Sequence, residues 1–409
     1  MKTNLAANIK DTPEGQQADK ILRTCVHCGF CTATCPTYQL LGDELDSPRG
    51  RIYLIKEMLE GNAVSAKTQL HLDRCLTCRA CETTCPSGVE YGKLVDIGRG
   101  IVESRVGRTP LEILKRKLLR TVIPNRALFA RLLRLGQWMR PVLPAAIAAK
   151  VPSSQVSGAW PTPRHARRML VLDGCAQPAL APDINAASAR LLDRIGISLE
   201  RADKAGCCGA VSYHLNAQEE GLAFMRRNID AWWPHVEAGV EAIVMTASGC
   251  GTLVKEYGDH LAHDPAYAAK AQRVAELCKD LSEIASQEAA QLADLIAKKP
   301  GRGKKIAFHS PCSLQHGQKI RGKVETLLRD AGFALTPIAD AHLCCGSAGT
   351  YSILQRDLSQ QLLGNKVAAL EAGSPETIAS ANIGCLTHIQ SAASIPVKHW
   401  VEVLEQALA

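Results

Sequence analysis

Aromatic residues are scarce in this chain of 409 residues, where Phe, Trp and Tyr together make up 4% of the sequence. Its cores must therefore be largely aliphatic. Long apolar runs are also missing, because arginine or proline interrupts every candidate well short of the roughly 20 residues that a membrane-spanning helix requires. No apolar segment of an export signal precedes the charged stretch around Lys10 and Asp11. We therefore expect neither a signal peptide nor a transmembrane segment.

Motifs for nucleotide binding and for nucleophilic catalysis are lacking too. The chain has no Gly-x-Gly-x-x-Gly after a strand, no phosphate-cradling loop and no Ser/His/Asp arrangement, and Gly249-Cys250-Gly251 alone is a weak signal. A substrate hydride therefore has no evident site. We expect no catalytic residue in this chain.

The composition is that of a folded soluble protein, with 46% hydrophobic and 22% charged residues. A chain of 409 residues is too long for one ordinary core, so two or three domains are expected.

Cysteine, in contrast, is abundant, and eight of the 17 cysteines stand in two copies of one pattern. The copies read Cys25-x-x-Cys28-x-x-Cys31-x-x-x-Cys35-Pro36 and Cys75-x-x-Cys78-x-x-Cys81-x-x-x-Cys85-Pro86. Three thiolates at steps of three reach three corners of one [4Fe-4S] cube, and the fourth belongs to the neighbouring cube in two-cluster ferredoxins. We therefore assign Cys25, Cys28, Cys31 and Cys85 to one cube, and Cys35, Cys75, Cys78 and Cys81 to the other. A pair of zinc sites is the alternative, but structural zinc usually takes paired cysteines separated by a long loop.

The cluster spacing and the odd number of cysteines also favour a reducing compartment. We expect the protein in the cytoplasm, or on the cytoplasmic face of the inner membrane as a peripheral protein.

Much of the net charge of +8 lies in one stretch, residues 105–140. This stretch holds ten basic residues and one acid, Glu112, and its leucines recur at helical spacing. Such a basic amphipathic connector fits contact with anionic lipid or with an acidic partner subunit, or a solvated face over ordinary core packing. Nucleic acid is a less suitable partner, because no aromatic residues are interleaved and no binding motif lies beside it. A proline-rich linker follows at residues 152–163.

Beyond the linker the chain repeats itself. Cys175, Cys207 and Cys250 find counterparts in Cys312, Cys344 and Cys385, at offsets of 137, 137 and 135 residues. Each half alternates short apolar runs with amphipathic helices, which is typical of a parallel α/β layer. The expected domains are 1–104 (two-cluster ferredoxin type), 105–165 (connector and linker), 166–299 (first cysteine-rich half) and 300–409 (second half), joined by Pro300-Gly301-Arg302-Gly303.

Each half offers four cysteines: Cys175, Cys207, Cys208 and Cys250 in the first, and Cys312, Cys344, Cys345 and Cys385 in the second. Loops after parallel strands converge on one edge of the sheet, so each quartet is a candidate for a further iron-sulfur centre or for a redox-active thiol pair. Small buried thiols in a core are the third interpretation. The remaining cysteine, Cys278, shares a helical face with Val274, Leu277, Leu281 and Ile284 and is predicted to lie in the core.

Five histidines lie near these motifs, namely His27, His309, His316, His342 and His388. A structural role is favoured for any one of them, although histidine also ligates metals and donates to cluster sulfurs. His388 is the strongest ligand candidate, because it stands three residues after Cys385, where a Cys-x-x-Cys pair would have its second thiol.

The twin cluster motifs followed by two Cys-Cys-Gly halves resemble the iron-sulfur subunit family shared by glycolate oxidase, anaerobic glycerol-3-phosphate dehydrogenase and heterodisulfide reductase. Residues 25–38, 47–55, 206–210, 246–250 and 344–351 look most like the bacterial glycolate oxidase branch of it. The resemblance implies two [4Fe-4S] clusters, FAD in a partner subunit rather than here, and electron transfer from glycolate oxidation to a quinone or another membrane acceptor.

The chain departs from the heterodisulfide reductase relatives at one point. Those relatives end each half with Cys-x-x-Cys, whereas Leu253 follows Cys250 and His388 follows Cys385 at that spacing. One ligand per half is therefore missing relative to that pattern. The alternative function is a thiol or disulfide reductase that uses a third centre at the Cys-Cys-Gly motifs, and a third reading is a docking platform without redox chemistry.

Overall fold

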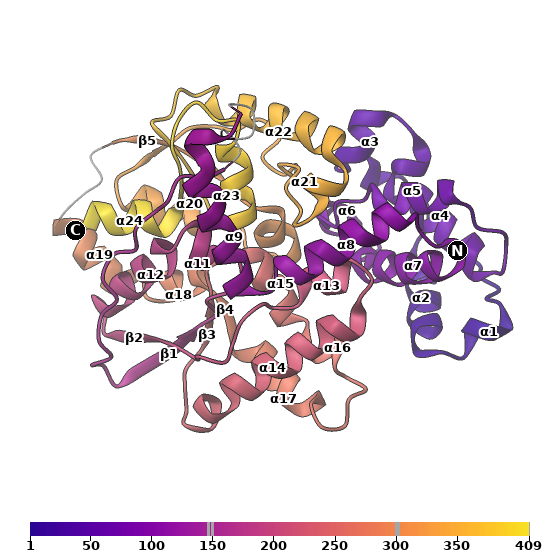
Figure 1. Ribbon diagram of the computed structural model, residues 1–409, viewed down its shortest axis with the longest axis horizontal. Coiled ribbons are helices and arrows are strands. Elements are labelled where there is room, and N and C mark those ends of the chain that lie inside the picture. The colour runs from indigo at the N-terminus through magenta and orange to yellow at the C-terminus, as the bar shows by residue number, and fades with distance from the viewer. Residues whose placement is uncertain (145–147, 149–150, 299–302, 409) are drawn as a thin grey trace.

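A computed structural model describes residues 1–144, 148, 151–298 and 303–408 of the chain. A helical module made by about the first hundred residues lies at one end of the molecule, and the duplicated module fills the other (Figure 1). The predicted fold class, a helical ferredoxin-like module followed by a duplicated α/β domain, is confirmed.

The N-terminal module is built from short helices around the two cysteine motifs. Its helix α4 is capped by Ser47, whose side chain accepts a hydrogen bond from the Gly50 N–H at 3.0 Å, and Pro48 occupies the first turn. Leu22, Ile55 and Leu94, from three different helices, are fully buried in the core of the module. The helices are α1 Ala7–Lys10, α2 Pro13–Thr24, α3 Pro36–Leu41, α4 Pro48–Leu59, α5 Ala66–Asp73, α6 Ala80–Thr84 and α7 Tyr91–Val106, with 3-10 turns at Phe30–Thr32 and Glu44–Asp46.

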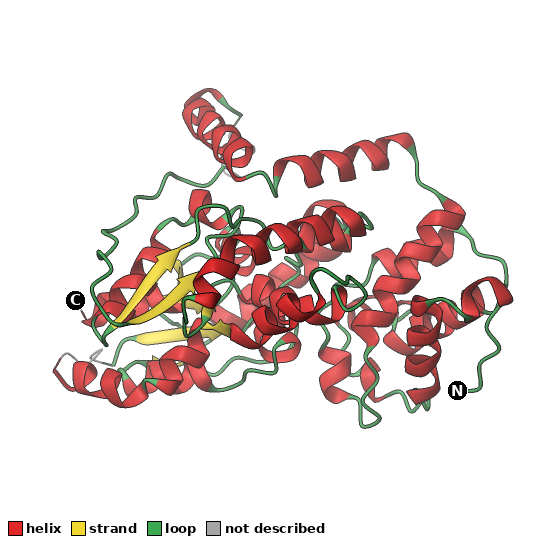
Figure 2. Ribbon diagram, turned by 90° about the horizontal axis from the view of Figure 1, so that it is seen from below, coloured by secondary structure: helices red, strands yellow, loops and turns green. Residues whose placement is uncertain are grey.

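The connector forms the two amphipathic helices that the sequence predicts, α8 Pro110–Val122 and α9 Arg126–Met139. Neither helix has a buried residue, and Leu114 and Leu118 are 62% and 60% exposed. Figure 2 shows the two helices standing off the body of the molecule. Ordinary core packing therefore does not explain their apolar residues. The last part of the predicted connector, 145–147 and 149–150, lies outside the described residues.

The duplicated module contains two four-stranded parallel sheets with the same topology. The first has the order β2-β1-β3-β4 and the second the order β6-β5-β7-β8. The strands are β1 Arg167–Val171, β2 Ile197–Arg201, β3 Ile243–Met245, β4 Cys278–Asp280, β5 Lys305–His309, β6 Ala334–Leu335, β7 Thr377–Ser380 and β8 Val397–His399.

Helices cover the faces of both sheets, and the two halves share one core. Leu191 and Ile284 of the first half belong to the same buried cluster as Leu328 and Trp400 of the second. The helices of the first half are α11 Gln177–Leu180, α12 Asp183–Asp193, α13 Ala210–His214, α14 Gln218–Glu237, α15 Ser248–Lys255, α16 Tyr257–His260, α17 Ala268–Leu277, α18 Leu281–Gln287 and α19 Ala289–Lys298. Those of the second are α20 Lys323–Asp330, α21 Tyr351–Leu354, α22 Arg356–Glu371, α23 Ile383–Gln390 and α24 Trp400–Leu408, together with a π-helical turn at Ser313–Gly317.

Cys278 is buried in the core, as expected, but the predicted helical face around it is wrong. Helix α17 ends at Leu277, and Cys278 begins strand β4, where it pairs with Ile243 of β3. The apolar residues on either side belong to two different helices, because the edge strand interrupts the helical run.

The linker from residue 152 to 163 has no regular secondary structure. It is nevertheless anchored, because Trp160 donates its indole N–H to the Leu199 carbonyl at 3.1 Å and stacks under Arg201. Of the predicted joining segment, Pro300-Gly301-Arg302 lies outside the described residues. Within the described part of the chain, no helix is both long enough and apolar enough to cross a bilayer.

Candidate metal centres

The two ferredoxin-type loops have the same backbone shape. His27 and Gly29 in the first loop have φ values of 55° and 86°, and Thr77 and Arg79 in the second have 53° and 60°. These left-handed residues stand two and four positions after Cys25 and Cys75, on either side of the second cysteine, so each loop coils tightly between its first and third cysteines. Pro36 begins α3 directly after Cys35 and turns the chain away from the loop.

The cysteines of the two motifs gather around two neighbouring cavities. Cys25, Cys28, Cys31 and Cys85 line the first cavity, and Cys35, Cys75, Cys78 and Cys81 line the second. Each motif thus contributes its last cysteine to the cavity of the other. Cys81 and Tyr91 line both cavities, so the two sites share a wall.

A buried arginine stands beside the second of these cavities. Arg51 is 1% exposed, and its guanidinium lies 3.1 Å from the Thr37 hydroxyl, 3.2 Å from the Asp46 carboxylate and 4.0 Å from Cys35 Sγ. Burial opposes its charge, but the anionic groups around it outweigh burial and raise its pKa. A fixed positive charge therefore faces the four thiols of the second cavity, where it can offset the charge of thiolates.

The first cavity is closer to the surface than the second. Cys28 is exposed, and Val26 and Phe30 beside it are 67% and 60% exposed. The four cysteines of the second cavity are buried or half-buried.

The two quartets of the duplicated module lie at the carboxyl ends of their sheets. Cys175 follows β1, Cys207 and Cys208 follow β2, and Cys250 lies at the start of α15 after β3. The second half repeats this placement with Cys312, Cys344, Cys345 and Cys385. The sequence predicted this edge because loops after parallel strands converge there.

Glycine is required after each cysteine pair. Gly209 and Gly346 have φ values of 102° and 88°, and a Cβ on Gly346 would lie 2.6 Å from the Ser359 carbonyl oxygen in α22. The N–H of Gly346 donates to Cys344 Sγ at 3.4 Å, and that of Gly209 donates to Cys207 Sγ at 3.5 Å. Because the glycine has no side chain, the backbone after the cysteine pair passes close to the helix. The two adjacent cysteines can therefore lie next to the other thiols of their quartet.

Within each quartet the thiols form a continuous row. Cys312 Sγ lies 3.8 Å from Cys344 Sγ, Cys344 is next to Cys345, and Cys345 is next to Cys385. The Cys344 thiol and then burial raise the pKa of Cys312, and in the first half the Cys207 thiol and then burial raise the pKa of Cys175. Thiols crowded in this way keep their protons unless a cation binds them, since a coordinating thiol is deprotonated.

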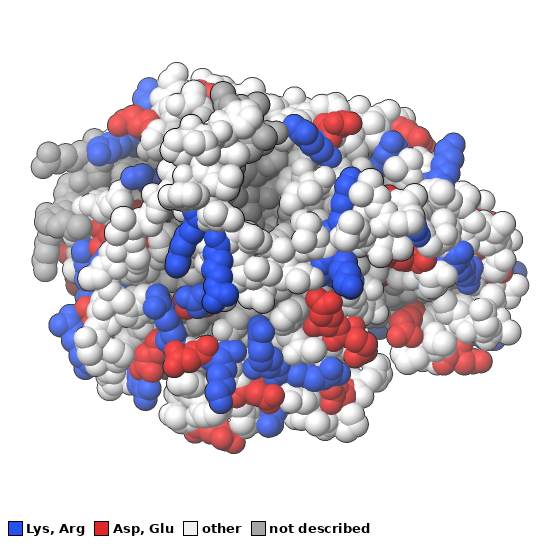
Figure 3. Space-filling model, viewed as in Figure 1, with Lys and Arg blue, Asp and Glu red and all other residues white. Residues whose placement is uncertain are grey.

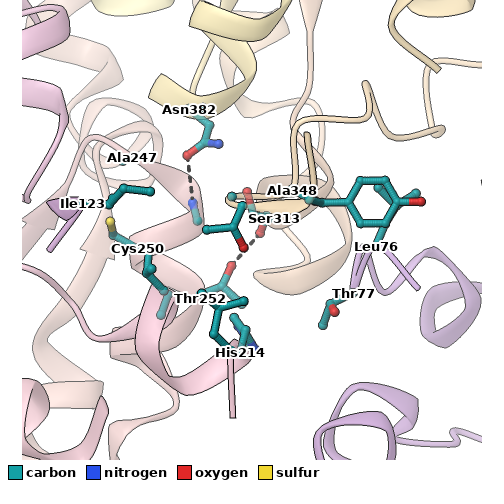
Figure 4. A pocket seen from close by; sticks show the side chains of 18 of the residues that line it. Leu76, Thr77, Ile123, His214, Ala247, Cys250, Thr252, Ser313, Ala348 and Asn382 are labelled. Atoms are coloured by element: carbon teal, nitrogen blue, oxygen red, sulfur yellow. Dashed lines mark hydrogen bonds between the residues drawn. The ribbon is translucent and has the colours of Figure 1, made fainter. Parts of the chain in front are cut away.

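One large cavity joins the two halves to the ferredoxin module. It has a volume of about 430 Å³ and is lined by seven of the eight repeat cysteines and by Cys75 and Cys78. Figure 4 shows Ile123 from the connector and Cys250 side by side on one side of the cavity and Leu76 from the second cluster loop on the other. Asn382 accepts a hydrogen bond from the Gly249 N–H at 3.2 Å and so links the two halves.

The second quartet contacts the ferredoxin module directly. Cys344 packs in one buried cluster with Leu76, and Cys78 and Cys312 lie against the same cluster. The Tyr351 hydroxyl donates to the Arg74 carbonyl at 3.1 Å. No local sequence pattern indicates this contact, because the residues are more than 200 positions apart.

The histidines near the motifs have different surroundings. His388 does not lie among the thiols, because its Nε2 bonds to the Ser359 hydroxyl at 3.2 Å. His316 bridges Thr83 and the His342 carbonyl, at 2.8 and 2.9 Å, and is a satisfied structural residue. His309 instead lies beside Cys345 and Cys385, and burial lowers its pKa to about 3, which keeps the imidazole neutral.

The residues around the two ferredoxin-type cavities fit [4Fe-4S] clusters. Four thiols line the second cavity, and the first is lined by four thiols besides the shared Cys81; four thiolates are the donor set of such a cluster. The second cavity also has the buried cation Arg51 beside it. The repeat quartets offer soft sulfur donors at similar spacing.

Comparison with known proteins agrees with this arrangement. Residues 21–89 match the 4Fe-4S dicluster domain family, and residues 169–255 and 306–390 match the cysteine-rich domain family. The chain is 59% identical over 411 aligned residues to the glycolate oxidase iron-sulfur subunit of Escherichia coli (strain K12), covering 100% of this chain and 99% of that protein. It is 30% identical to the probable glycolate oxidase iron-sulfur subunit of Bacillus subtilis (strain 168), over 90% of this chain and 88% of the relative.

A more distant relative, lactate utilization protein A of Bacillus licheniformis, is 28% identical over 56% of this chain and 95% of its own length. The two full-length matches and the two matched domain families agree with the cysteine geometry. The chain therefore belongs to the family of glycolate oxidase iron-sulfur subunits.

Proposed function

We propose that this chain is the electron-transfer subunit of a flavin-dependent glycolate oxidase, with glycolate oxidised to glyoxylate on FAD in a partner subunit. When bound, its two [4Fe-4S] clusters supply one-electron transfer. The observation that carries the proposal is the exchange of the last cysteines, Cys35 and Cys85, between two cavities that share a wall. We assign Cys25, Cys28, Cys31 and Cys85 to one cluster, and Cys35, Cys75, Cys78 and Cys81 to the other.

The exposed side of the first cavity is the proposed contact with the flavin subunit. Cys28 is exposed there, between the exposed apolar side chains of Val26 and Phe30. Apolar side chains at the surface favour association with another protein, and a partner seated on them would bring its flavin close to this cavity.

The connector helices are the proposed contact with the cytoplasmic face of the inner membrane. Lys115, Lys117, Arg131, Arg134 and Arg140 form no ion pair within the described residues, and Leu114 and Leu118 are exposed on α8. Figure 3 shows Lys and Arg side chains on the face of the molecule that α8 and α9 cross in Figure 1. Free cations beside exposed leucines suit an anionic lipid surface, from which a quinone-type acceptor would be reached.

Lipid vesicles test this contact. The purified complex is expected to sediment with vesicles that contain anionic lipid, to be released at high salt because exposed charges are screened, and to bind at least tenfold less when Leu114 and Leu118 are changed to Asp. Replacing Ile123, which follows α8 and lines the large cavity, by Val is the matched control. Equal binding by the Asp variant would contradict membrane contact through α8.

A second candidate function is a thiol or disulfide reductase, and the large cavity favours it, because thiols of both halves face one space. The quartets are also our candidates for a further iron-sulfur centre. Iron and sulfide analysis separates the candidates, since about eight irons per chain fit two cubes alone and a clear excess indicates metal in a quartet.

The relay itself is tested with the purified subunits. This chain alone is expected to show no glycolate turnover with an artificial acceptor, whereas the complex turns over and loses transfer to quinone when Cys28 is changed to Ser. Appreciable turnover by the isolated chain would contradict the relay. Electron paramagnetic resonance during a redox titration of the complex then gives the potentials of the clusters.

A further inference from the structure

The second half holds a buried imidazole next to its thiols, and the first half does not. His309 ends strand β5 and is 2% exposed. One of its ring nitrogens and the Sγ atoms of Cys345 and Cys385 all lie within 4.8 Å of one another. The position 137 residues earlier, which corresponds to His309 in the first half, is Leu172.

The imidazole lacks the hydrogen bond that a buried histidine needs. Nε2 of His309 is enclosed and has no hydrogen-bond partner in the part of the chain that the structure describes. Buried polar groups in native proteins are nearly always satisfied, since leaving one without a partner costs about 1–3 kcal/mol. His316 and His399, which are also buried, each have a partner for Nε2. Nε2 of His71, His260 and His342 also lacks a partner. Among the described residues, His309 is distinguished by the two thiols beside its ring, and the two observations together call for a ligand.

A buried cation accompanies this imidazole. Lys366 is 4% exposed and donates to the Asp340 carbonyl at 2.8 Å. Burial lowers the pKa of Lys366, and the neighbouring thiols of Cys344 and Cys345 oppose that shift. Gly346 and Gly209 contact equivalent positions of α22 and α14, and in that register the residue of the first half that corresponds to Lys366 is the buried but uncharged Asn228. The second quartet thus has a buried lysine placed to offset the negative charge that its thiols acquire on binding a metal, whereas the cation at the first quartet is Arg227, which donates to the Cys207 carbonyl at 3.3 Å.

We propose that His309 is a metal ligand, which together with Cys345 and Cys385 forms a mixed imidazole–thiolate centre in the second half. The first quartet, with Leu172 in place of the histidine, offers thiolates only. This inference rests on the proposed metal-binding role of the quartets and goes beyond it by making the two halves chemically different. Both iron and zinc accept this donor set.

The different ligand has a consequence for electron transfer. A neutral imidazole in place of a thiolate removes negative charge from a centre, and such a replacement raises the potential of an iron-sulfur cluster. The centre with His309 lies on the side of the cavity where Cys312 and Cys344 pack against Leu76 and Cys78. An iron centre there would accept electrons from the ferredoxin module more readily than an all-thiolate one.

The test compares metal content and ligand spectra in the anaerobically purified complex. We expect iron beyond the two cubes, or zinc, in the unchanged protein, and loss of that metal alone in His309→Leu, which copies the first half. His309→Cys restores the metal without nitrogen coordination, and His388→Ala leaves it unchanged. Nitrogen ligation is read from electron spin echo modulation for iron, or from X-ray absorption for zinc.

Three outcomes would overturn the inference. These are no metal beyond two intact cubes, unchanged metal in His309→Leu, or a nitrogen signal that persists in His309→Cys. The resonance of the two cubes reports in every variant whether the chain has folded. Absence of the cubes themselves would instead contradict the proposed electron-transfer function, so the two failures are distinguishable.

Discussion

Changing Arg51 to Met is expected to lower the potential of one cluster and leave the other nearly unchanged. Methionine keeps a long apolar side chain at a site that is 1% exposed and removes the charge that lies 4.0 Å from Cys35 Sγ. Without this cation the extra electron of a reduced cluster is less stabilised, so the potential of the cluster at Cys35, Cys75, Cys78 and Cys81 falls.

The magnitude follows from the distance. Two unit charges about 4 Å apart interact by about 4 kcal/mol at an effective dielectric constant of about 20, which is about 170 mV for a one-electron couple. The electron is spread over a cube whose other corners lie farther from Arg51, so we expect about half of this, roughly 80 mV. In the variant the fully buried Asp46 keeps its contacts with Arg74 and His71 but loses the one with Arg51. Breaking a buried ion pair lowers the free energy of unfolding by about 3–5 kcal/mol, so we expect this loss as well.

The assay is a redox titration of the complex followed by electron paramagnetic resonance, together with urea unfolding of the chain. Arg23→Met is the matched control, because the Arg23–Asp19 pair is exposed and such pairs contribute less than about 1 kcal/mol. An equal shift of both clusters, or a shift below about 20 mV, would refute the placement of this charge beside one set of thiols.

Three other sets of substitutions test the site and the fold. Cys85→Ser is expected to remove the cluster at Cys25, Cys28 and Cys31, and Cys35→Ser the other one, so identical residual spectra would contradict the exchange between motifs. Gly346→Ala is expected to lower the free energy of unfolding in urea by more than about 3 kcal/mol, because a clash with α22 is added to the strain of a left-handed residue. Gly349→Ala is the control, since its surroundings are open, and it should cost about 1–2 kcal/mol. Equal costs for the two variants would show that α22 moves aside. Cys278→Ala should cost about 1 kcal/mol and leave metal content intact, and loss of metal would show that it is not simply a core residue.

Local patterns were sufficient where the chemistry is local. The cap and first turn of α4 depend on Ser47 and Pro48, which both act within a few residues. The duplication was visible because cysteines recur at the same offsets, and the parallel sheets followed from the alternation of apolar runs and helices. Cys278 was misplaced on a helix, because a three-residue edge strand is too short to interrupt helical periodicity in the sequence.

The short range of sequence patterns also explains why His388 rather than His309 was predicted as the strongest ligand candidate. Spacing singled out His388, since it stands where a second thiol would stand, but its ring turns to Ser359. His309 looked like an ordinary residue near Cys312, and only packing at the sheet edge brings it to Cys345 and Cys385. The role of Lys366 had no signal in the sequence, because its position depends on how α22 lies over the second sheet.

The sequence by itself determined the cysteine motifs, the duplication and the family, because cysteine spacing, glycine stops and apolar periodicity act over short stretches of chain. The tertiary structure alone decided that the connector leaves its leucines exposed, that the second quartet packs against the second cluster loop, and that the two halves surround one cavity. These contacts join residues hundreds of positions apart. Their formation depends on the packing of whole surfaces against one another, and no short stretch of sequence encodes it.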